Sequence, residues 1–230
     1  MLQKTTPDDG TLPENRTGDS TDYTLDEHRH RFAVWAAACA YRRGGSGGGY
    51  TYRNAKLMLE TAGVRETRSV QDLPEPDQID AYIDVLIHKL MAAAPPTYTA
   101  KVKPGNGDTA KTEKVVLTFI CTYGRAAKLV NIYLKSKLIC GNTQHDDIRL
   151  AKLHPPLDRE LLNALDRLAR EKQDKSVPEL FRKLWAVART KGDAWTEFDK
   201  PTYEAYIAAI KALQGGLPLW AVEKYWKNEE

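Results

Sequence analysis

Apolar side chains that recur every three or four residues constrain the fold of this chain more than any other feature. This spacing places them on one face of an α-helix. Comparable stripes follow one another from residue 24 almost to the C-terminus, separated by glycines and prolines. The pattern predicts a mainly all-α fold, a compact multi-helix single domain over residues 24–230. The clearest stripe consists of Ile79, Ile83, Leu86, Ile87 and Leu90.

Capping signals and helix breakers predict the individual boundaries. Thr24 and Glu27 have the spacing of a capping box, so a first helix should begin there and run to about Arg43, before the glycine run 44–49. Ser176 and Glu179 form a second capping box ahead of another helix. The other helices are expected over 51–62, from 77 to the two prolines at 95–96, over 115–120, 126–138 and 158–171, and after residues 199 and 217.

Two segments fall outside the helical pattern. Residues 1–23 hold too few large apolar side chains to offset the entropy of ordering, which predicts a flexible N-terminal tail. Residues 95–111 alternate weakly in polarity around a Pro-Gly-Asn-Gly sequence at 104–107, which predicts a small β-hairpin or an extended loop. We therefore expect at most one small β element.

The composition narrows the class of protein. At 230 residues and 42% hydrophobic content, the chain can bury a substantial core. No stretch approaches the ~18 apolar residues that span a bilayer, and the N-terminus has no signal-type apolar run. We expect a cytoplasmic monomer with no membrane partner. The three cysteines and five histidines lack the spacing of zinc ligands, so we expect reduced core cysteines, no metal and no cofactor.

The charge distribution points to phosphate as a partner. The net charge of +3 is compatible with binding a polyanion, and the first 30 residues are rich in acids. Basic residues concentrate in the middle of the chain instead, so phosphate contacts are expected there. The clusters are Arg42-Arg43, Lys101-Lys103, Lys111-Lys114 and Arg125-Lys128-Lys135-Lys137.

Two segments of this middle region carry the strongest functional pattern. Residues 123–134 read Tyr-Gly-Arg-Ala-Ala-Lys-Leu-Val-Asn-Ile-Tyr-Leu, and residues 155–162 read Pro-Pro-Leu-Asp-Arg-Glu-Leu-Leu. Together they resemble the core of the helix-hairpin-helix DNA glycosylase superfamily, which includes endonuclease III and 8-oxoguanine glycosylase. Members of that superfamily are helical and flip a damaged or modified base out of double-stranded DNA. They place a hairpin beside the phosphate backbone and an essential aspartate at the next helix start.

The resemblance implies a role for each part of the pattern. Asp158 takes the catalytic place, where a carboxylate stabilises the positive charge that develops on the sugar as the N-glycosidic bond breaks. Helices over 115–120 and 126–138 would enclose a tight hairpin, and Gly124, Arg125, Lys128 and Lys135 would contact DNA. The flipped base would enter an aromatic-lined pocket. The candidates for its walls are Trp35, Tyr133, Trp195, Phe198 and Trp220.

The sequence departs from the family at the hairpin. Residues 121–124 read Cys-Thr-Tyr-Gly where the family has Leu-Pro-Gly-x-Gly, and Ala126 stands in the place of the Schiff-base lysine of bifunctional members. The resemblance therefore implies a monofunctional enzyme that removes the base without cutting the strand, with lyase activity by Lys128 as an alternative. DNA repair and antiviral defence against modified phage DNA are both compatible with it.

Other functions fit the same residues. An aspartate that follows two prolines often serves only as a helix cap, a role worth about 1 kcal/mol. Arg149 and His154 have the Arg-x4-His spacing of HEPN-type ribonucleases, helical enzymes for which such a pair suits phosphodiester cleavage. The third alternative is a non-enzymatic helical adaptor that binds nucleic acid or protein, with Trp220, Tyr225 and Trp226 at its interface.

Overall fold

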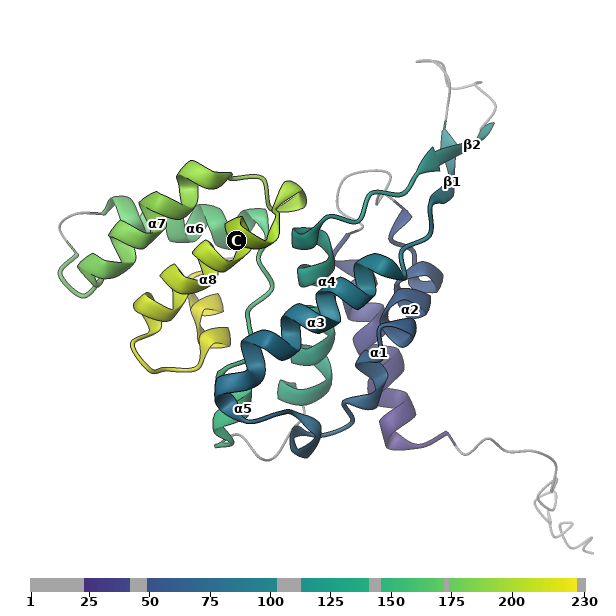
Figure 1. The fold of residues 1–230 in the computed structure, drawn as a ribbon, viewed down its shortest axis with the longest axis horizontal. Helices are drawn as coiled ribbons and strands as arrows, with labels where there is room; N and C mark the ends of the chain where they lie inside the picture. Colours follow the sequence, from purple (N-terminus) through teal and green to yellow (C-terminus); the bar gives the residue numbers. More distant parts are fainter. Residues whose placement is uncertain (1–22, 42–48, 103–112, 141–145, 172–173, 227–230) are drawn as a thin grey trace, which may run out of the picture.

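The computed structural model describes residues 23–41, 49–102, 113–140, 146–171 and 174–226. Most of these residues are helical, and the strands among them form one two-stranded sheet (Figure 1). The mainly all-α fold predicted from the sequence is therefore confirmed. The expected tail up to residue 22, the arginines at 42–43, the glycines at 44–48 and the turn at 104–107 lie outside the described residues.

Four helices form the N-terminal group of the molecule. Thr24 caps the first of them as predicted, because its hydroxyl accepts a hydrogen bond of 3.2 Å from the Glu27 amide. The third buries all five residues of the stripe that the sequence predicted. Short 3-10 turns η2 (Val64–Glu66), η3 (Val70–Asp72) and η4 (Pro76–Gln78) connect the second to the third. The four helices are α1 (Leu25–Cys39), α2 (Tyr52–Thr61), α3 (Ile79–Ala92) and α4 (Tyr123–Leu134).

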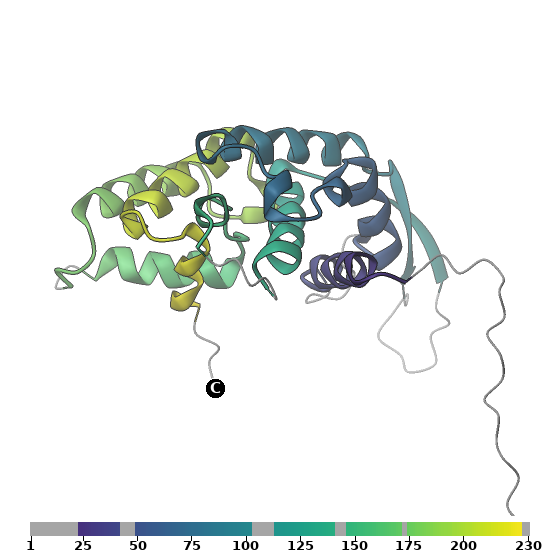
Figure 2. The same cartoon turned by 90° about the horizontal axis from the view of Figure 1, so that it is seen from below.

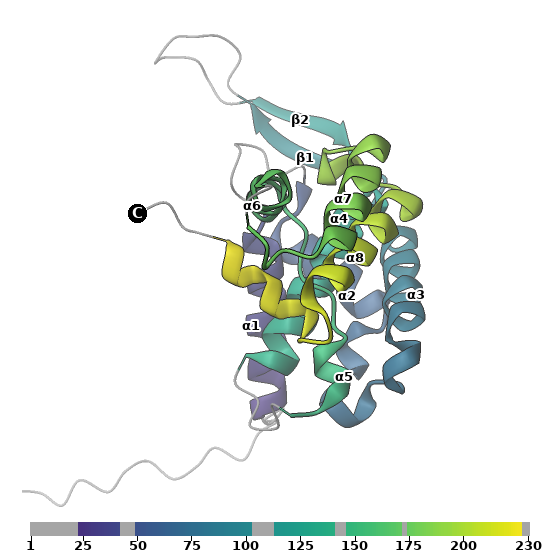
Figure 3. The same cartoon turned by 90° about the vertical axis from the view of Figure 1, so that its left-hand side faces the viewer.

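The three long helices after residue 158 form a C-terminal group that packs on the other side of α4, whereas the short α5 lies near the start of α3 (Figure 1). Within it, α7 packs against both α6 and α8. Buried side chains of the two groups join in one hydrophobic core. Figures 2 and 3 show α1 and α6 on the face of the molecule opposite α3. The elements are α5 (Ile148–Ala151), α6 (Arg159–Arg170), α7 (Glu179–Lys191), η6 (Trp195–Glu197), α8 (Lys200–Gln214) and η7 (Leu219–Tyr225).

A wide helical turn follows α4 directly. The segment η5 (Lys135–Ile139) is a π-helix, in which the Cys140 amide donates to the Lys135 carbonyl at 3.0 Å. A π turn holds more residues than an α turn, so it changes which side chains face inward. Lys137 and Leu138 are both buried in this segment.

The sheet corrects one prediction. β1 (Thr97–Val102) pairs antiparallel with β2 (Glu113–Thr118), with Thr97 opposite Thr118, and the ribbon projects from the helical body beside α2 (Figure 1). The small β element expected over 95–111 is therefore present, but the helix expected over 115–120 is wrong. The run Val-Val-Leu-Thr is rich in β-branched residues, and a short apolar run of this kind fits a strand as well as a helix. The pairing of this run with β1 makes it a strand and not a helix.

Smaller corrections concern the C-terminal group. Ser176 is not the cap of α7, because Pro178 occupies that position and the Ser176 hydroxyl binds Asp174 at 2.6 Å instead. The last element, η7, is a 3-10 helix rather than an α-helix. On α7, Phe181 and Trp185 are buried, whereas Leu180 and Val187 are exposed.

Two further observations bear on the class of protein. Cys39 and Cys121 are half-buried free thiols, whereas Cys140 is exposed and so is not the core residue that the sequence predicted. Among the described residues, no single helix is long and apolar enough to cross a membrane, although α8 and η7, bent 82° apart, pass that test as a pair.

Candidate active site

Asp158 stands where the sequence placed it, at the first turn of α6. It follows Pro155, Pro156 and Leu157 and has extended backbone angles, φ −139° and ψ 174°. Its Oδ1 accepts a hydrogen bond of 2.9 Å from the Leu161 amide, which satisfies one of the amides left free at a helix start. The carboxylate is thereby fixed in orientation, with Oδ2 left to face other partners.

Lys128 supplies the partner of the second oxygen. It lies on α4, only 6% of its side chain is exposed, and its Nζ is 3.5 Å from Asp158 Oδ2. The same ammonium lies 4.3 Å from the centre of the Trp195 ring and 5.8 Å from that of Tyr41. A cation over an aromatic face is attracted by the ring quadrupole. Lys128 is therefore held between a carboxylate and two aromatic rings.

Trp195 reaches this position because its segment docks on the start of α4. The Gly124 amide donates to the Phe198 carbonyl at 3.0 Å, and the Thr122 hydroxyl donates to the Thr196 carbonyl at 2.7 Å. A Cβ atom at position 124 would lie 2.0 Å from the Trp195 carbonyl oxygen, so this close approach requires glycine. Gly124 thus serves as a docking point for the 195–198 segment.

The predicted hairpin at Tyr123-Gly124 is consequently wrong. Gly124 lies inside the first turn of α4, after a strand rather than a helix, and its amide is used within the protein. The cap of α4 is Thr122, whose hydroxyl accepts from the Arg125 amide at 3.3 Å. The physical reason is the pairing of β2 with β1, which removes the first helix that a hairpin needs.

A pocket of about 460 Å³ opens beside this group. It lies where α1, α4, the start of α6 and the 195–197 turn meet. Sites for small organic ligands commonly have volumes of ~300–1,000 Å³, so a flipped nucleoside fits in size. The pocket is lined by Ala40, Lys128, Asp158, Arg159, Glu160, Trp195 and Trp226.

The other predicted DNA-binding residues have internal partners. The Arg125 guanidinium donates to the Ile120 carbonyl at 3.3 Å, and the Arg125 carbonyl accepts from the Tyr41 hydroxyl. Lys135 forms an ion pair with Glu223, which attaches η7 to η5. Of the four predicted contacts, the structure brings only Lys128 into the pocket with Asp158.

Among the five predicted pocket aromatics, only Trp195 lines the pocket. Tyr133 is fully buried, with its hydroxyl 2.8 Å from His30 Nδ1, and Phe198 is buried and stacked on Tyr206. Trp35 is 49% exposed on α1, and Trp220 is half-buried outside the pocket lining. Tyr133 and Phe198 are thus core residues, and helical spacing alone did not separate them from a pocket aromatic such as Trp195.

Trp226, expected from the sequence at the interface of an adaptor, lies in the pocket wall. Trp226 is the last described residue and is 37% exposed. Its sequence surroundings carry no signal for this position, because the other residues of the pocket lining lie between 31 (Trp195) and 186 (Ala40) positions away along the chain.

Arg149 and His154, the pair expected for a ribonuclease, do not act together, because each is bound to other side chains. The Arg149 guanidinium makes two hydrogen bonds to Asp147, at 2.9 and 2.6 Å, while His154 is buried between the Tyr203 hydroxyl at 3.0 Å and Asp80 at 2.9 Å. Burial lowers the pKa of His154, although the hydrogen bond to Asp80 opposes the shift. A histidine that is 6% exposed is poorly placed to exchange protons with a polynucleotide.

No group of three or more histidine, cysteine, aspartate or glutamate side chains within the described residues has the geometry to hold a metal ion. Comparison of the chain with family models, with curated proteins and with solved structures gives no match. The function is therefore inferred from the geometry of the pocket.

Proposed function

We propose that this chain is a monofunctional DNA glycosylase that hydrolyses the N-glycosidic bond of a damaged or modified base in double-stranded DNA. One observation carries the proposal: Asp158, Lys128 and Trp195 come from three separate segments and meet in one open pocket. A helix cap requires only the carboxylate. The resemblance of residues 155–162 to the glycosylase superfamily adds support, whereas the hairpin part of that resemblance does not.

The pocket suits a nucleotide that has left the base stack. Its volume of about 460 Å³ admits a base with its sugar, and the indoles of Trp195 and Trp226 offer apolar surface to the base. Stacking on an aromatic side chain is worth ~1–3 kcal/mol per base and tolerates different bases. This energy would offset part of the cost of unpairing, which is a few kcal/mol and lowest for a damaged base.

Asp158 would act on the sugar. As the bond between C1′ and the base nitrogen breaks, positive charge develops on the sugar ring, and a carboxylate fixed nearby stabilises it. Water supplies the nucleophile: its oxygen bonds to C1′ and keeps one proton as the new hydroxyl, while its other proton passes by way of Asp158 or solvent to the nitrogen of the departing base. Oδ1 is held by the Leu161 amide, so Oδ2 is the oxygen available to the sugar or to that water.

The ion pair favours hydrolysis over lyase chemistry. A lysine nucleophile must lose its proton before its nitrogen can attack C1′, and a carboxylate 3.5 Å from Lys128 Nζ stabilises the protonated form. Among the described residues that line the pocket, Lys128 is nevertheless the one lysine, so strand cleavage is the second candidate activity. Borohydride would reduce the imine between the lysine and an abasic sugar, and a covalent adduct lost in Lys128→Gln would establish it.

The chain offers a matched control for the main experiment. Asp199 caps α8 with the same geometry as Asp158, because its Oδ1 accepts from the Thr202 amide at 2.9 Å, but it is exposed and outside the pocket. Purified protein would be incubated with DNAs that carry damaged or modified bases, including modified phage genomes, and abasic sites counted with an aldehyde-reactive probe.

We expect abasic sites with the unchanged protein and with Asp199→Asn, and a loss of about 100-fold or more with Asp158→Asn, the size seen when one electrostatic contact to the reacting centre is removed. Equal activity of the two variants would contradict the role of Asp158. No abasic sites on any DNA would contradict the proposed function.

A further inference from the structure

A second, smaller pocket lies near the N-terminal end of α1, between α1, the turn at 68–71 and η5. Its volume is about 60 Å³. That is room for a few waters or one tetrahedral oxyanion, but not for a base, since one water needs ~10–15 Å³ of such volume. Three of the side chains that line it are the cations Arg29, Arg68 and Lys137, and none of the described residues in its wall is acidic.

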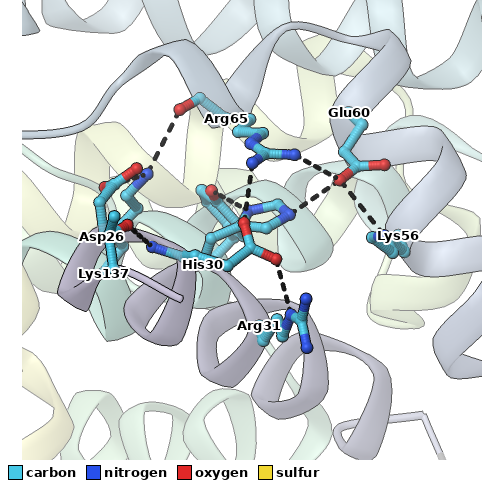
Figure 4. A network of polar contacts seen from close by, with 10 residues as sticks. Asp26, His30, Arg31, Lys56, Glu60, Arg65 and Lys137 are labelled. Carbon is cyan, nitrogen blue, oxygen red and sulfur yellow. Dashed lines mark hydrogen bonds and ion pairs between the residues drawn. The ribbon is translucent and has the colours of Figure 1, made fainter. Parts of the chain in front are cut away.

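Lys137 contributes a buried positive charge. Its side chain has no exposed surface, and its Nζ lies 3.2 Å from Asp26 Oδ1 and 3.3 Å from the Arg65 carbonyl oxygen (Figure 4). Burial lowers the pKa of Lys137, and the charges of Arg65 and Arg68 act in the same direction, against the hydrogen bond to Asp26. Another anion beside this ammonium would offset its desolvation.

The neighbouring carboxylates are already engaged with other groups. Glu27 pairs with Arg31 and Arg65, and Glu60 pairs with Arg65, Lys56 and His30 (Figure 4). These acids pair with cations that do not line the pocket, and Asp26 pairs with Lys137. The described residues of the wall itself include three cations and no acid.

The turn that carries Arg68 is held in place before any ligand arrives. The amides of Arg68 and Ser69 both donate to Asp72 Oδ2, at 3.0 and 2.8 Å, and the Ser69 hydroxyl donates to the same oxygen at 3.0 Å. A fixed turn reduces the entropy that is lost on binding. The two arginines also provide planar donors of the kind that match phosphate oxygens.

The small pocket and the candidate active site lie along the same helix. Arg29 lines the former and Ala40 lines the latter. Eleven residues separate them, which is close to three helical turns, so both face the same side of α1 about 16 Å apart. This distance equals the axial rise of about five nucleotides in one strand of B-DNA.

We propose that the pocket between Arg29, Arg68 and Lys137 binds a backbone phosphate of the DNA strand whose base enters the Asp158 pocket. The assignment rests on the proposed function for its substrate, but its test does not require excision. The same chemistry would also accept free inorganic phosphate, and the experiment separates the two sources.

The test measures the affinity of the full chain for a fluorescein-labelled DNA duplex across a series of chloride concentrations. Each phosphate contact contributes about 0.9 to the slope of log Kobs against log salt. This slope is negative, and we expect Arg68→Gln to reduce its magnitude by about 0.9 and Arg29→Gln to act similarly. Arg53→Gln, which removes an exposed arginine of α2 outside the pocket, should leave the slope unchanged.

Inorganic phosphate, compared with chloride at equal ionic strength, should weaken DNA binding by the unchanged protein more than binding by Arg68→Gln. If Arg68→Gln leaves the salt slope unchanged, the proposal is overturned. If inorganic phosphate nevertheless binds at Arg68 in that case, the pocket is a site for the free ion and not for DNA. Far-ultraviolet circular dichroism confirms folding of each variant. If excision depends on Asp158 but Arg68→Gln leaves the salt slope unchanged, the phosphate site is contradicted and the glycosylase proposal stands. If Arg68→Gln reduces the magnitude of the slope but no base is excised, the glycosylase proposal alone is contradicted.

Discussion

Two helices of this molecule begin in the same way and differ in what surrounds their first turn. Asp158 caps α6 and Asp199 caps α8, each with Oδ1 accepting at 2.9 Å from the amide three residues further on. Beside Asp158 lie Lys128, with 6% of its side chain exposed, and Trp195 in an open pocket. Asp199 is exposed and takes its hydrogen bonds from Thr202. Capping thus explains the role of Asp158 Oδ1 but not the ion pair between Oδ2 and Lys128. That unexplained ion pair argues for a function beyond folding.

The largest effect should come from removing the Asp158 carboxylate, measured against removal of the Asp199 carboxylate. Asp199→Ala should lower the free energy of unfolding by about 1 kcal/mol, the usual cost of a lost cap. Asp158→Ala should lower it by about 2–4 kcal/mol, because it also leaves the nearly buried Lys128 ammonium without its carboxylate. Urea unfolding followed by circular dichroism measures both. Equal losses would show that the ion pair contributes nothing.

A slightly smaller effect is expected at the contact that brings Trp195 to Asp158. Gly124→Ala places a Cβ atom against the Trp195 carbonyl and should cost about 1–3 kcal/mol of stability, as overpacking does. Because the backbone at 195–198 has to move, excision should fall as well, while the α8 cap stays intact. Thermal unfolding and the abasic-site assay report the two effects. An unchanged melting temperature would contradict the close approach.

A double-mutant cycle should isolate the ion pair itself. For Lys128→Met and Asp158→Ala we expect a coupling free energy of about 1–2 kcal/mol, the range found for residues in contact. The matched cycle pairs Asp199→Ala with Lys191→Met, since Lys191 acts on Asp199 only through its charge at the surface. That coupling should stay below about 0.5 kcal/mol. A larger value at Asp199 would remove the distinction between the two caps.

The smallest effect is a pH dependence at the exposed cap. Hydrogen bonds from Thr202 lower the pKa of Asp199 below its ordinary value of 3.8. A carboxylate with a lowered pKa stabilises the folded state fully above the unfolded pKa and loses this contribution as the pH falls through the folded pKa. The stability advantage of the unchanged protein over Asp199→Asn should therefore shrink below about pH 4. Urea titrations at pH 3 and pH 6 test the trend, and an advantage that grows in acid would contradict it.

Features set by neighbouring residues could be predicted from the sequence. Thr24 with Glu27, the stripe from Ile79 to Leu90 and the cap at Asp158 all follow from contacts within a few positions. Residues 115–118 could not be assigned in this way, because their short apolar run fits either state and the partner strand begins eighteen positions earlier.

In the candidate site, too, features set by neighbouring residues could be predicted, whereas those set by distant contacts could not. Asp158 and Lys128 were predicted as separate features, one by its helix start and one by its place in a basic cluster. Their contact with Trp195 depends on how the 195–198 segment docks on Gly124, and glycine at that position gave a different prediction, a hairpin. Close approach of two backbones has no local pattern, so this part of the site required the structure.

The π turn at 135–139 links the length of this helical segment to the burial of one charged side chain. A π turn holds about one residue more than an α turn, so the residues that follow it are rotated about the helix axis by roughly one residue's step. Deleting Ser136 should restore a regular helix and turn Lys137 out of the interior. The wide turn and the buried ammonium should therefore be gained or lost together, because without the extra residue the position of Lys137 faces solvent.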